Sequence, residues 1–164
     1  MDARRQSEPH VKYQTTAERK SDRELIVRRT FDAPARIVFE AWTRPELFKR
    51  WWAPKSLGVS IFSCELDVRV GGGYRIVFGD GGPESMAFFG KYLEVKPGSK
   101  LVWTNEEGGE GGPITSLTLE EKGGRTLLEL HELHESKESL DANLGFAEGL
   151  REMFDQLDEL LLQL

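Results

Sequence analysis

The sequence has few of the residues that form disulfides, cross membranes or contact nucleic acid. Cys64 is the only cysteine among 164 residues, so no intrachain disulfide can form. The 22 Lys and Arg residues are outnumbered by 28 Asp and Glu, which gives a net charge of −6. Such a chain, with no basic run, is a poor match for nucleic acid, because neutralised phosphates supply most non-specific affinity. The apolar runs are far too short to span a bilayer, and the N-terminus has no apolar signal region. We therefore expect a cytoplasmic protein that neither enters a membrane nor binds nucleic acid.

Motifs for metal binding, cofactor binding and catalysis are also missing. His131 and His134 resemble part of a zinc-protease motif, but that motif would need a histidine where Glu135 stands. The glycine-rich stretches 79–82 and 108–112 lie between predicted strands, whereas phosphate-binding loops open helices. No serine–histidine–acid elbow occurs. The sequence therefore predicts no metal, no cofactor and no catalytic residues.

The first 22 residues are polar, charged and without an apolar period. This composition is typical of a flexible arm. The remaining length fits one domain with a substantial core. We therefore predict an arm at residues 1–22 and a single domain at residues 23–164.

The last stretch, from Ser139 to Leu164, has the clearest helical period in the chain. Its apolar positions are Leu140, Leu144, Phe146, Ala147, Leu150, Met153, Phe154, Leu157, Leu160, Leu161 and Leu164. This pattern predicts one amphipathic helix roughly 39 Å long. Gly145 and Gly149 each cost about 1 kcal/mol relative to alanine in a helix. They indicate either close approach of the sheet backbone or room left for a ligand.

Before this helix the chain reads mainly as strands. Seven β-rich segments, at about 24–31, 62–69, 74–78, 85–95, 100–105, 114–120 and 126–133, are separated by glycine- and proline-rich turns. Two short helices, separated by Arg44-Pro45, follow the first strand. Short connections favour antiparallel neighbours. We therefore predict an α+β fold in which a curved antiparallel sheet, bent near residues 71–73 and 90, surrounds the long helix.

Several segments, in order and spacing, resemble the Hsp-90 ATPase activator homologue family of the START-like, or SRPBCC, superfamily. The segments are Phe31-Asp-Ala-Pro34, Val38-Phe-Glu-Ala-Trp-Thr43, Trp51-Trp-Ala-Pro54, Asp67-Val-Arg-Val-Gly-Gly-Gly-Tyr74, Gly90-Lys-Tyr-Leu-Glu-Val-Lys-Pro97, Leu101-Val-Trp-Thr104, Thr126-Leu-Leu-Glu-Leu-His131, Gly145-Phe-Ala-Glu-Gly-Leu150 and Leu157-Asp-Glu-Leu-Leu161. The resemblance covers residues 24–164. It implies the helix-grip fold, with a cavity between the long helix and the sheet. It also implies a binder of a small hydrophobic ligand, with chaperone activators, antibiotic-resistance proteins and polyketide cyclases among the relatives.

Aromatic side chains are the main candidates for lining such a cavity. Apolar pockets typically combine aromatic walls with a few polar groups that fix orientation. The predicted ligand-binding residues are Trp51, Trp52, Phe88, Trp103, His131, Phe146, Gly149 and Met153. Packing in the core is the alternative for any one of these aromatic residues.

Glu65, Asp67 and Arg69 alternate with Cys64, Leu66 and Val68, which puts the charged residues on one strand face. They form either a solvated stripe or, at Arg69 and Glu65, a polar anchor for a ligand.

Three functions therefore remain open. The sequence favours a module that binds a small hydrophobic or amphipathic molecule and is not an enzyme. The alternatives are a co-chaperone-type interaction module and a cyclase- or hydrolase-like enzyme. The sequence does not decide between a monomer and a homodimer.

Overall fold

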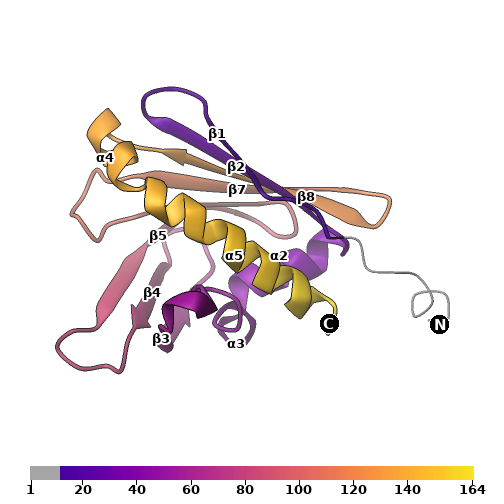
Figure 1. Ribbon diagram of the computed structural model, residues 1–164, viewed down its shortest axis with the longest axis horizontal. Helices are drawn as coiled ribbons and strands as arrows, with labels where there is room; N and C mark the ends of the chain where they lie inside the picture. The colour runs from indigo at the N-terminus through magenta and orange to yellow at the C-terminus, as the bar shows by residue number, and fades with distance from the viewer. Residues whose placement is uncertain (1–11) are drawn as a thin grey trace.

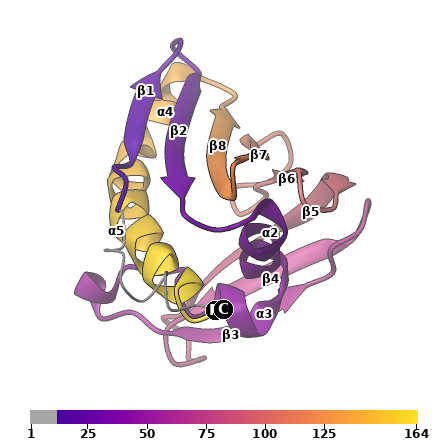
Figure 2. The same ribbon diagram turned by 90° about the vertical axis from the view of Figure 1, so that its right-hand side faces the viewer.

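The protein forms one curved antiparallel sheet around a helix. The computed structural model describes residues 12–164 (Figure 1). Its eight strands follow the order β1-β2-β8-β7-β6-β5-β4-β3, and Figure 2 labels all of them. The strands are β1 (Thr16–Arg19), β2 (Glu24–Phe31), β3 (Ile61–Leu66), β4 (Gly73–Phe78), β5 (Met86–Lys96), β6 (Lys100–Thr104), β7 (Ile114–Lys122) and β8 (Arg125–Leu133). All neighbouring strands pair antiparallel. Short loops from β3 to β8 make consecutive strands neighbours, as the sequence predicts.

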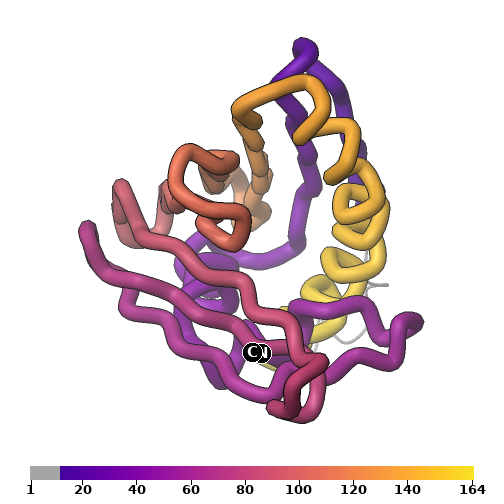
Figure 3. The backbone as a smooth tube through the Cα atoms, turned by 90° about the vertical axis from the view of Figure 1, so that its left-hand side faces the viewer, coloured from indigo at the N-terminus to yellow at the C-terminus, as the bar shows by residue number. Residues whose placement is uncertain are grey.

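The sheet bends within β5. Gly90 pairs with Tyr74 of β4, and a Cβ atom at Gly90 would collide with the carbonyl oxygen of Thr104. Two residues later, the pairing with β6 shifts register between Tyr92 and Glu94. A glycine and a bulge so close together let one strand turn sharply. The sheet therefore curls into the open ring seen in Figure 3.

The helices fill the concave side and one end of this sheet. They are α2 (Ala35–Thr43), α3 (Pro45–Phe48), a short 3₁₀ turn (Lys55–Leu57), α4 (Lys137–Ala142) and α5 (Leu144–Leu161). In Figure 2, α5 runs between the two edges of the curled sheet, and α2 and α3 lie across one end. This arrangement confirms the predicted α+β helix-grip fold.

The C-terminal segment is not one helix, as predicted, but two. Asn143 separates α4 from α5 with φ −96° and ψ 0°, outside the helical range. Its side-chain amide donates to Glu132 Oε1 on β8 at 3.0 Å. Helical periodicity continues across this break in the sequence, so the period alone did not reveal it. Leu144, just after the break, and Leu164, beyond the end of α5, are exposed, although we placed both on the apolar face.

The rest of the predicted apolar face is confirmed. Its buried members are Leu140, Ala147, Leu150, Met153, Phe154, Leu157, Leu160 and Leu161. They pack with residues of β2, α2 and β8 in one core. Apolar burial of this kind is the main favourable term in folding.

The prediction of a flexible arm is wrong for its last part, and residues 1–11 lie outside the described residues. Thr16–Arg19 form β1, which pairs with β2. Just before it, Thr15 is buried, and its hydroxyl accepts a hydrogen bond from Arg29 at 3.0 Å. Arg151 of α5 donates to the Thr15 carbonyl. These polar contacts hold a strand that has no apolar pattern of its own, so no local pattern predicts it.

Deleting residues 1–22 is expected to destabilise the domain by more than about 2 kcal/mol, a core-type loss. The deletion removes β1, exposes the edge of β2 and leaves Arg29 without Thr15. Urea unfolding followed by circular dichroism measures the change. A variant lacking only residues 1–11 keeps every contact of β1 described above and is the control. Equal stability of the full chain and the longer deletion would show that β1 adds nothing.

Candidate functional site

A cavity of about 390 Å³ lies between α5 and the concave face of the sheet. Most of its wall is apolar and aromatic. The main apolar contributors are Trp42, Phe48, Trp52, Leu66, Tyr74, Ile76, Phe78, Phe88, Tyr92, Leu101, Trp103, Leu130, Phe146 and Met153. Its size and lining fit the usual range for a site that takes a small organic molecule.

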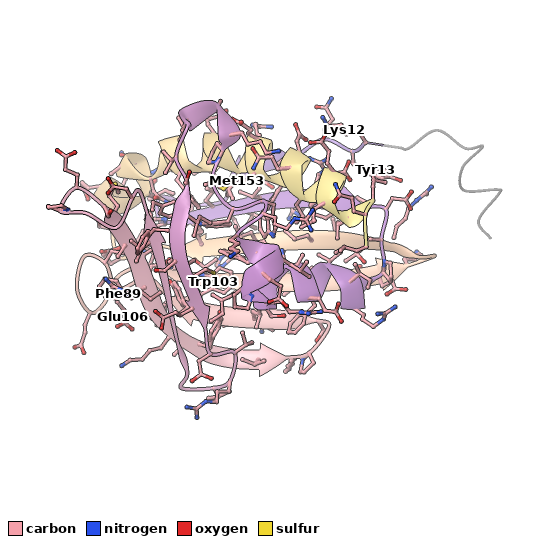
Figure 4. All side chains as sticks on the ribbon, turned by 90° about the horizontal axis from the view of Figure 1, so that it is seen from below. Lys12, Tyr13, Phe89, Trp103, Glu106 and Met153 are labelled. Atoms are coloured by element: carbon pink, nitrogen blue, oxygen red, sulfur yellow. The ribbon has the colours of Figure 1, made fainter. Side chains whose placement is uncertain are left out.

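Six of the predicted ligand-binding residues line this cavity. They are Trp52, Phe88, Trp103, Phe146, Gly149 and Met153. Trp103 comes from β6 and Met153 from the opposing helix α5 (Figure 4). Trp52 lies next to Phe146, with ring centroids 5.8 Å apart, and stacks on Phe48 at 5.0 Å. The aromatic wall is therefore assembled from elements far apart in the chain.

The two glycines of α5 face open space. A Cβ atom at Gly145 would meet no atom within 4 Å, and one at Gly149 would meet only Pro54, at 3.5 Å. Both glycines line the cavity. The sheet backbone does not approach them, so the packing explanation for the pair is wrong. Their missing side chains enlarge the cavity.

The segment between α3 and the 3₁₀ turn is fastened to α5 by a buried amide. Gln156 donates to the carbonyls of Trp51 and Ala53, both at 3.0 Å, and accepts from the Lys55 amide at 2.9 Å. Ala53 has φ 103°, a strained conformation for a residue with a Cβ atom. Gln156 therefore holds a strained turn that presents Trp52 and Pro54 to the cavity.

A second contact fixes the same segment one helical turn away. Glu152 accepts hydrogen bonds from the amide and the hydroxyl of Ser56, at 2.9 and 2.5 Å. These bonds hold the pKa of the Glu152 carboxyl below its usual value. Because Gln156 and Glu152 are polar residues on a helix, the sequence offered no signal that they bind this segment.

Exposed apolar side chains mark where the cavity opens. Leu57, Val59 and Met86 line the cavity, and Leu57 and Met86 are 68% and 62% exposed. We call these three the mouth residues. The loop after β6 borders the cavity at Glu107 and Gly108. This loop is held against β5 by a hydrogen bond from the backbone amide of Glu106 to the carbonyl of Phe89, at 2.9 Å (Figure 4). A ligand has a route from solvent past the mouth residues.

Trp51 does not line the cavity, although we predicted that it would. It is fully buried, and its indole nitrogen donates to the Ala41 carbonyl at 2.9 Å. Its ring packs against Trp42 at 4.8 Å and Phe154 at 6.2 Å. Two adjacent tryptophans point in different directions, so only Trp52 reaches the cavity.

His131 also lies away from the cavity, which corrects our prediction. On β8 the residues Thr126, Leu128, Leu130 and Glu132 are buried, while the alternate positions are more exposed. His131 belongs to the outer set and lies 3.3 Å from Glu24 of β2. Its neighbour Glu132 lines the cavity. The period of two in the sequence contained this signal, because Glu132 continues the series of Leu128 and Leu130.

Glu132 is the centre of a buried polar cluster. It is 4% exposed, and its Oε1 accepts from Asn143 Nδ2 and contacts His134 Nε2, both at 3.0 Å. The other ring nitrogen of His134 lies 2.8 Å from Ser139 Oγ. His134 is itself buried, and it lies between the end of β8 and the Ser136 N-cap of α4. The cluster ties β8 to the break between α4 and α5.

Further polar groups lie on the same side of the cavity. Asn105 donates to Thr115 Oγ1 at 2.9 Å, and both residues line the wall. Thr115 pairs with Glu132 across β7 and β8. Nearby, Glu107 accepts from the Phe89 amide at 3.0 Å, and burial raises the pKa of its carboxyl. The cavity thus has one polar side in an otherwise apolar wall.

Glu65 and Arg69 do not form the predicted polar anchor. Both are exposed, β3 ends at Leu66, and Arg69 pairs with Asp67 at 3.0 Å with its side chain 73% exposed. Because β3 ends before Asp67, the alternation that we predicted for residues 64–69 does not extend to Arg69. The charges form a solvated stripe, the other reading that we had left open.

The described residues include neither a grouped set of metal ligands nor an activated thiol. Among residues 12–164, no group of three or more His, Cys, Asp or Glu side chains is placed to hold a metal ion. Burial raises the pKa of the Cys64 thiol to about 11, which keeps it protonated and poorly nucleophilic. No helix in the described part of the chain is long and apolar enough to cross a membrane.

Comparisons with known proteins agree with this architecture. A family model described as "Activator of Hsp90 ATPase homolog 1-like protein" matches residues 32–162. A crystal structure of a Rhodobacter sphaeroides protein has a TM-score of 0.80 at 24% identity, covering 92% of this chain and 99% of that one. The solution structure of an AHSA1-like protein from Aeromonas hydrophila has a TM-score of 0.66 at 17% identity, covering 82% of this chain and 92% of that one. No curated protein matches the chain.

Proposed function

Because the chain belongs to the Activator of Hsp90 ATPase homolog 1-like family, whose START-like fold it shares, we propose that it binds a small hydrophobic or amphipathic molecule in the cavity beneath α5. Family and fold together support a ligand-binding or co-chaperone-type module. The observation that carries the choice is the apolar cavity itself. Gly145 and Gly149 present no side chain toward it and so leave it larger.

Burial of an apolar ligand here has a clear driving force. The wall offers aromatic side chains from sheet and helix, and apolar area removed from water is worth roughly 25 cal/mol per Å². The mouth residues add apolar surface at the entrance. A protein that acted only through its outer surface would gain no stability from an unfilled cavity of this size.

Gly149→Leu is expected to abolish ligand binding while the melting temperature stays the same or rises. The new side chain fills the cavity, and replacing a helical glycine gains about 1 kcal/mol of helix propensity. Binding is measured with N-phenyl-1-naphthylamine, a neutral dye that brightens in apolar surroundings. Energy transfer from Trp52 and Trp103, which line the cavity, reports where the dye sits.

Glu148→Leu is the matched control, because Glu148 is the preceding residue on α5 and its side chain is 73% exposed. It adds the same leucine on the solvent side and should bind dye as the wild type does. A wild type that never binds dye, together with a strongly destabilised Gly149→Leu, would refute the binding function. The interaction-module function would then be favoured.

A further inference from the structure

The charged lining of the cavity has only one sign. Glu107, Glu132 and Glu135 line it, and no lysine, arginine or histidine of the described chain does. Glu107 and Glu135 lie at the more exposed rim, whereas Glu132 is buried in the wall. In a site shielded from water, a fixed charge acts on a ligand with little screening.

Glu132 lines the cavity, and only one of its two carboxylate oxygens is engaged by the protein. Both of its hydrogen bonds, from Asn143 and with His134, involve Oε1. Its second oxygen, Oε2, has no hydrogen-bond partner among the described residues. An ionised carboxylate only accepts hydrogen bonds. The cavity wall therefore contains a carboxylate whose Oε1 is held by Asn143 and His134, while its Oε2 is still able to accept one further bond.

His134 does not add a positively charged or donating group to the cavity wall. Its side chain is 1% exposed, and its two ring nitrogens are occupied by Glu132 and Ser139. It does not line the cavity, so it offers no donor to a bound anion. Its contact with Glu132 orients the carboxylate without replacing it at the cavity surface.

Building on the proposed function, we infer that the cavity selects amphipathic molecules whose polar end donates hydrogen bonds, above all a primary ammonium group, and rejects those that end in a carboxylate. The apolar part of the ligand lies among the aromatic rings, and its polar end meets Glu132. Charge-assisted hydrogen bonds are about twice as strong as neutral ones, whereas two carboxylates repel. The order of preference is therefore amine, then alcohol, then carboxylate.

The test displaces N-phenyl-1-naphthylamine from the full chain with decylamine, 1-decanol and decanoate, which share one tail. At pH 7 the amine is a cation and the acid an anion, because the ordinary pKa values of such groups are about 10.4 and 4.3. We expect decylamine to displace the dye at a concentration at least about tenfold lower than decanoate, with decanol between them. Equal potency of amine and carboxylate, or stronger binding of decanoate, would overturn the inference while dye binding still upheld the proposed function.

Glu132→Gln assigns the effect to one residue. The amide keeps an oxygen for Asn143 and His134 but loses the charge, so the amine's advantage should fall about tenfold with little change for decanol. Glu129→Gln is the control, because it removes the same charge from the outer face of β8, where Glu129 pairs with Arg28 at 2.9 Å. Equal loss of preference in both variants would attribute the effect to net charge and refute the assignment.

A measurement on the wild type covers the case in which Glu132→Gln does not fold. The side-chain amide of Asn143 donates a hydrogen bond to Glu132, so the NMR signals of this amide report on the carboxylate. Saturating decylamine should shift them, and decanoate should not. Displacement of the dye by decylamine without any shift at Asn143 would show that the ammonium group lies elsewhere.

Discussion

Replacing Phe154 with aspartate is expected to prevent the domain from folding. Phe154 is fully buried on α5, with ring centroids 5.9 Å from Phe31 and 6.2 Å from Trp51. Losing the ring costs about 3–5 kcal/mol. An unpaired carboxylate in the same place adds several kcal/mol more, which together exceeds the lower part of the usual stability range of about 5–15 kcal/mol. Loss of the circular dichroism and cooperative urea transition of the wild type is the expected readout.

The control is Leu162→Asp, which introduces the same carboxylate at an exposed position just beyond α5. Its cost should stay below about 1 kcal/mol, the sum of a surface change and a weak repulsion by the helix C-terminus. Similar losses in the two variants would mean that the buried face of α5 has been assigned wrongly.

The fold could be predicted because its main signals are local. Alternating apolar residues mark the strands from Glu24 to Leu133, and the helical period marks α5. The elements that were missed depend on tertiary contacts. Thr16–Arg19 pair with β2 next to Thr15, which is held by Arg29 and Arg151, and Asn143 at the helix break is hydrogen-bonded to Glu132. No pattern within either segment reports such distant partners.

The cavity was predicted in part for the same reason. Aromatic residues and helical glycines carry a recognisable preference for cavity walls, and six of the eight predicted residues line the wall. Trp51 and Trp52 are chemically identical neighbours, and only the turn held by Gln156 decides which one faces the cavity. Glu132 was not among the predicted residues because a histidine is the more familiar ligand-binding residue type, although the strand period puts Glu132 and not His131 on the inner face.

The alternation of β2 likewise places a polar residue, Arg29, among the buried inward-facing positions. Leu25, Val27 and Phe31 form the inner face of β2, and Arg29 continues it. Its guanidinium is fully buried, with Nη1 2.9 Å from Asp155 and Nη2 3.8 Å from Asp158 on α5. It also lies 5.3 Å from the ring centroid of Phe31. Two acidic residues of α5 therefore meet a buried cation on β2.

Arg29→Met is expected to destabilise the protein by about 3 kcal/mol, because removing one partner of a buried ion pair leaves the charge opposite it poorly compensated. Asp158 is buried, so loss of the nearby cation affects it most. In the double variant Arg29→Met, Asp158→Asn, the second change removes that charge and should recover part of the loss. Asp155 is more exposed and also lies 3.4 Å from Lys12, so Asp155→Ala should cost less than Arg29→Met.

Urea unfolding of all three variants measures these differences. A cost for Arg29→Met no greater than that of a surface substitution, about 0.5 kcal/mol, would show that the cluster adds nothing to stability. No recovery in the double variant would show that the loss comes from packing around the arginine stem and not from the buried charge.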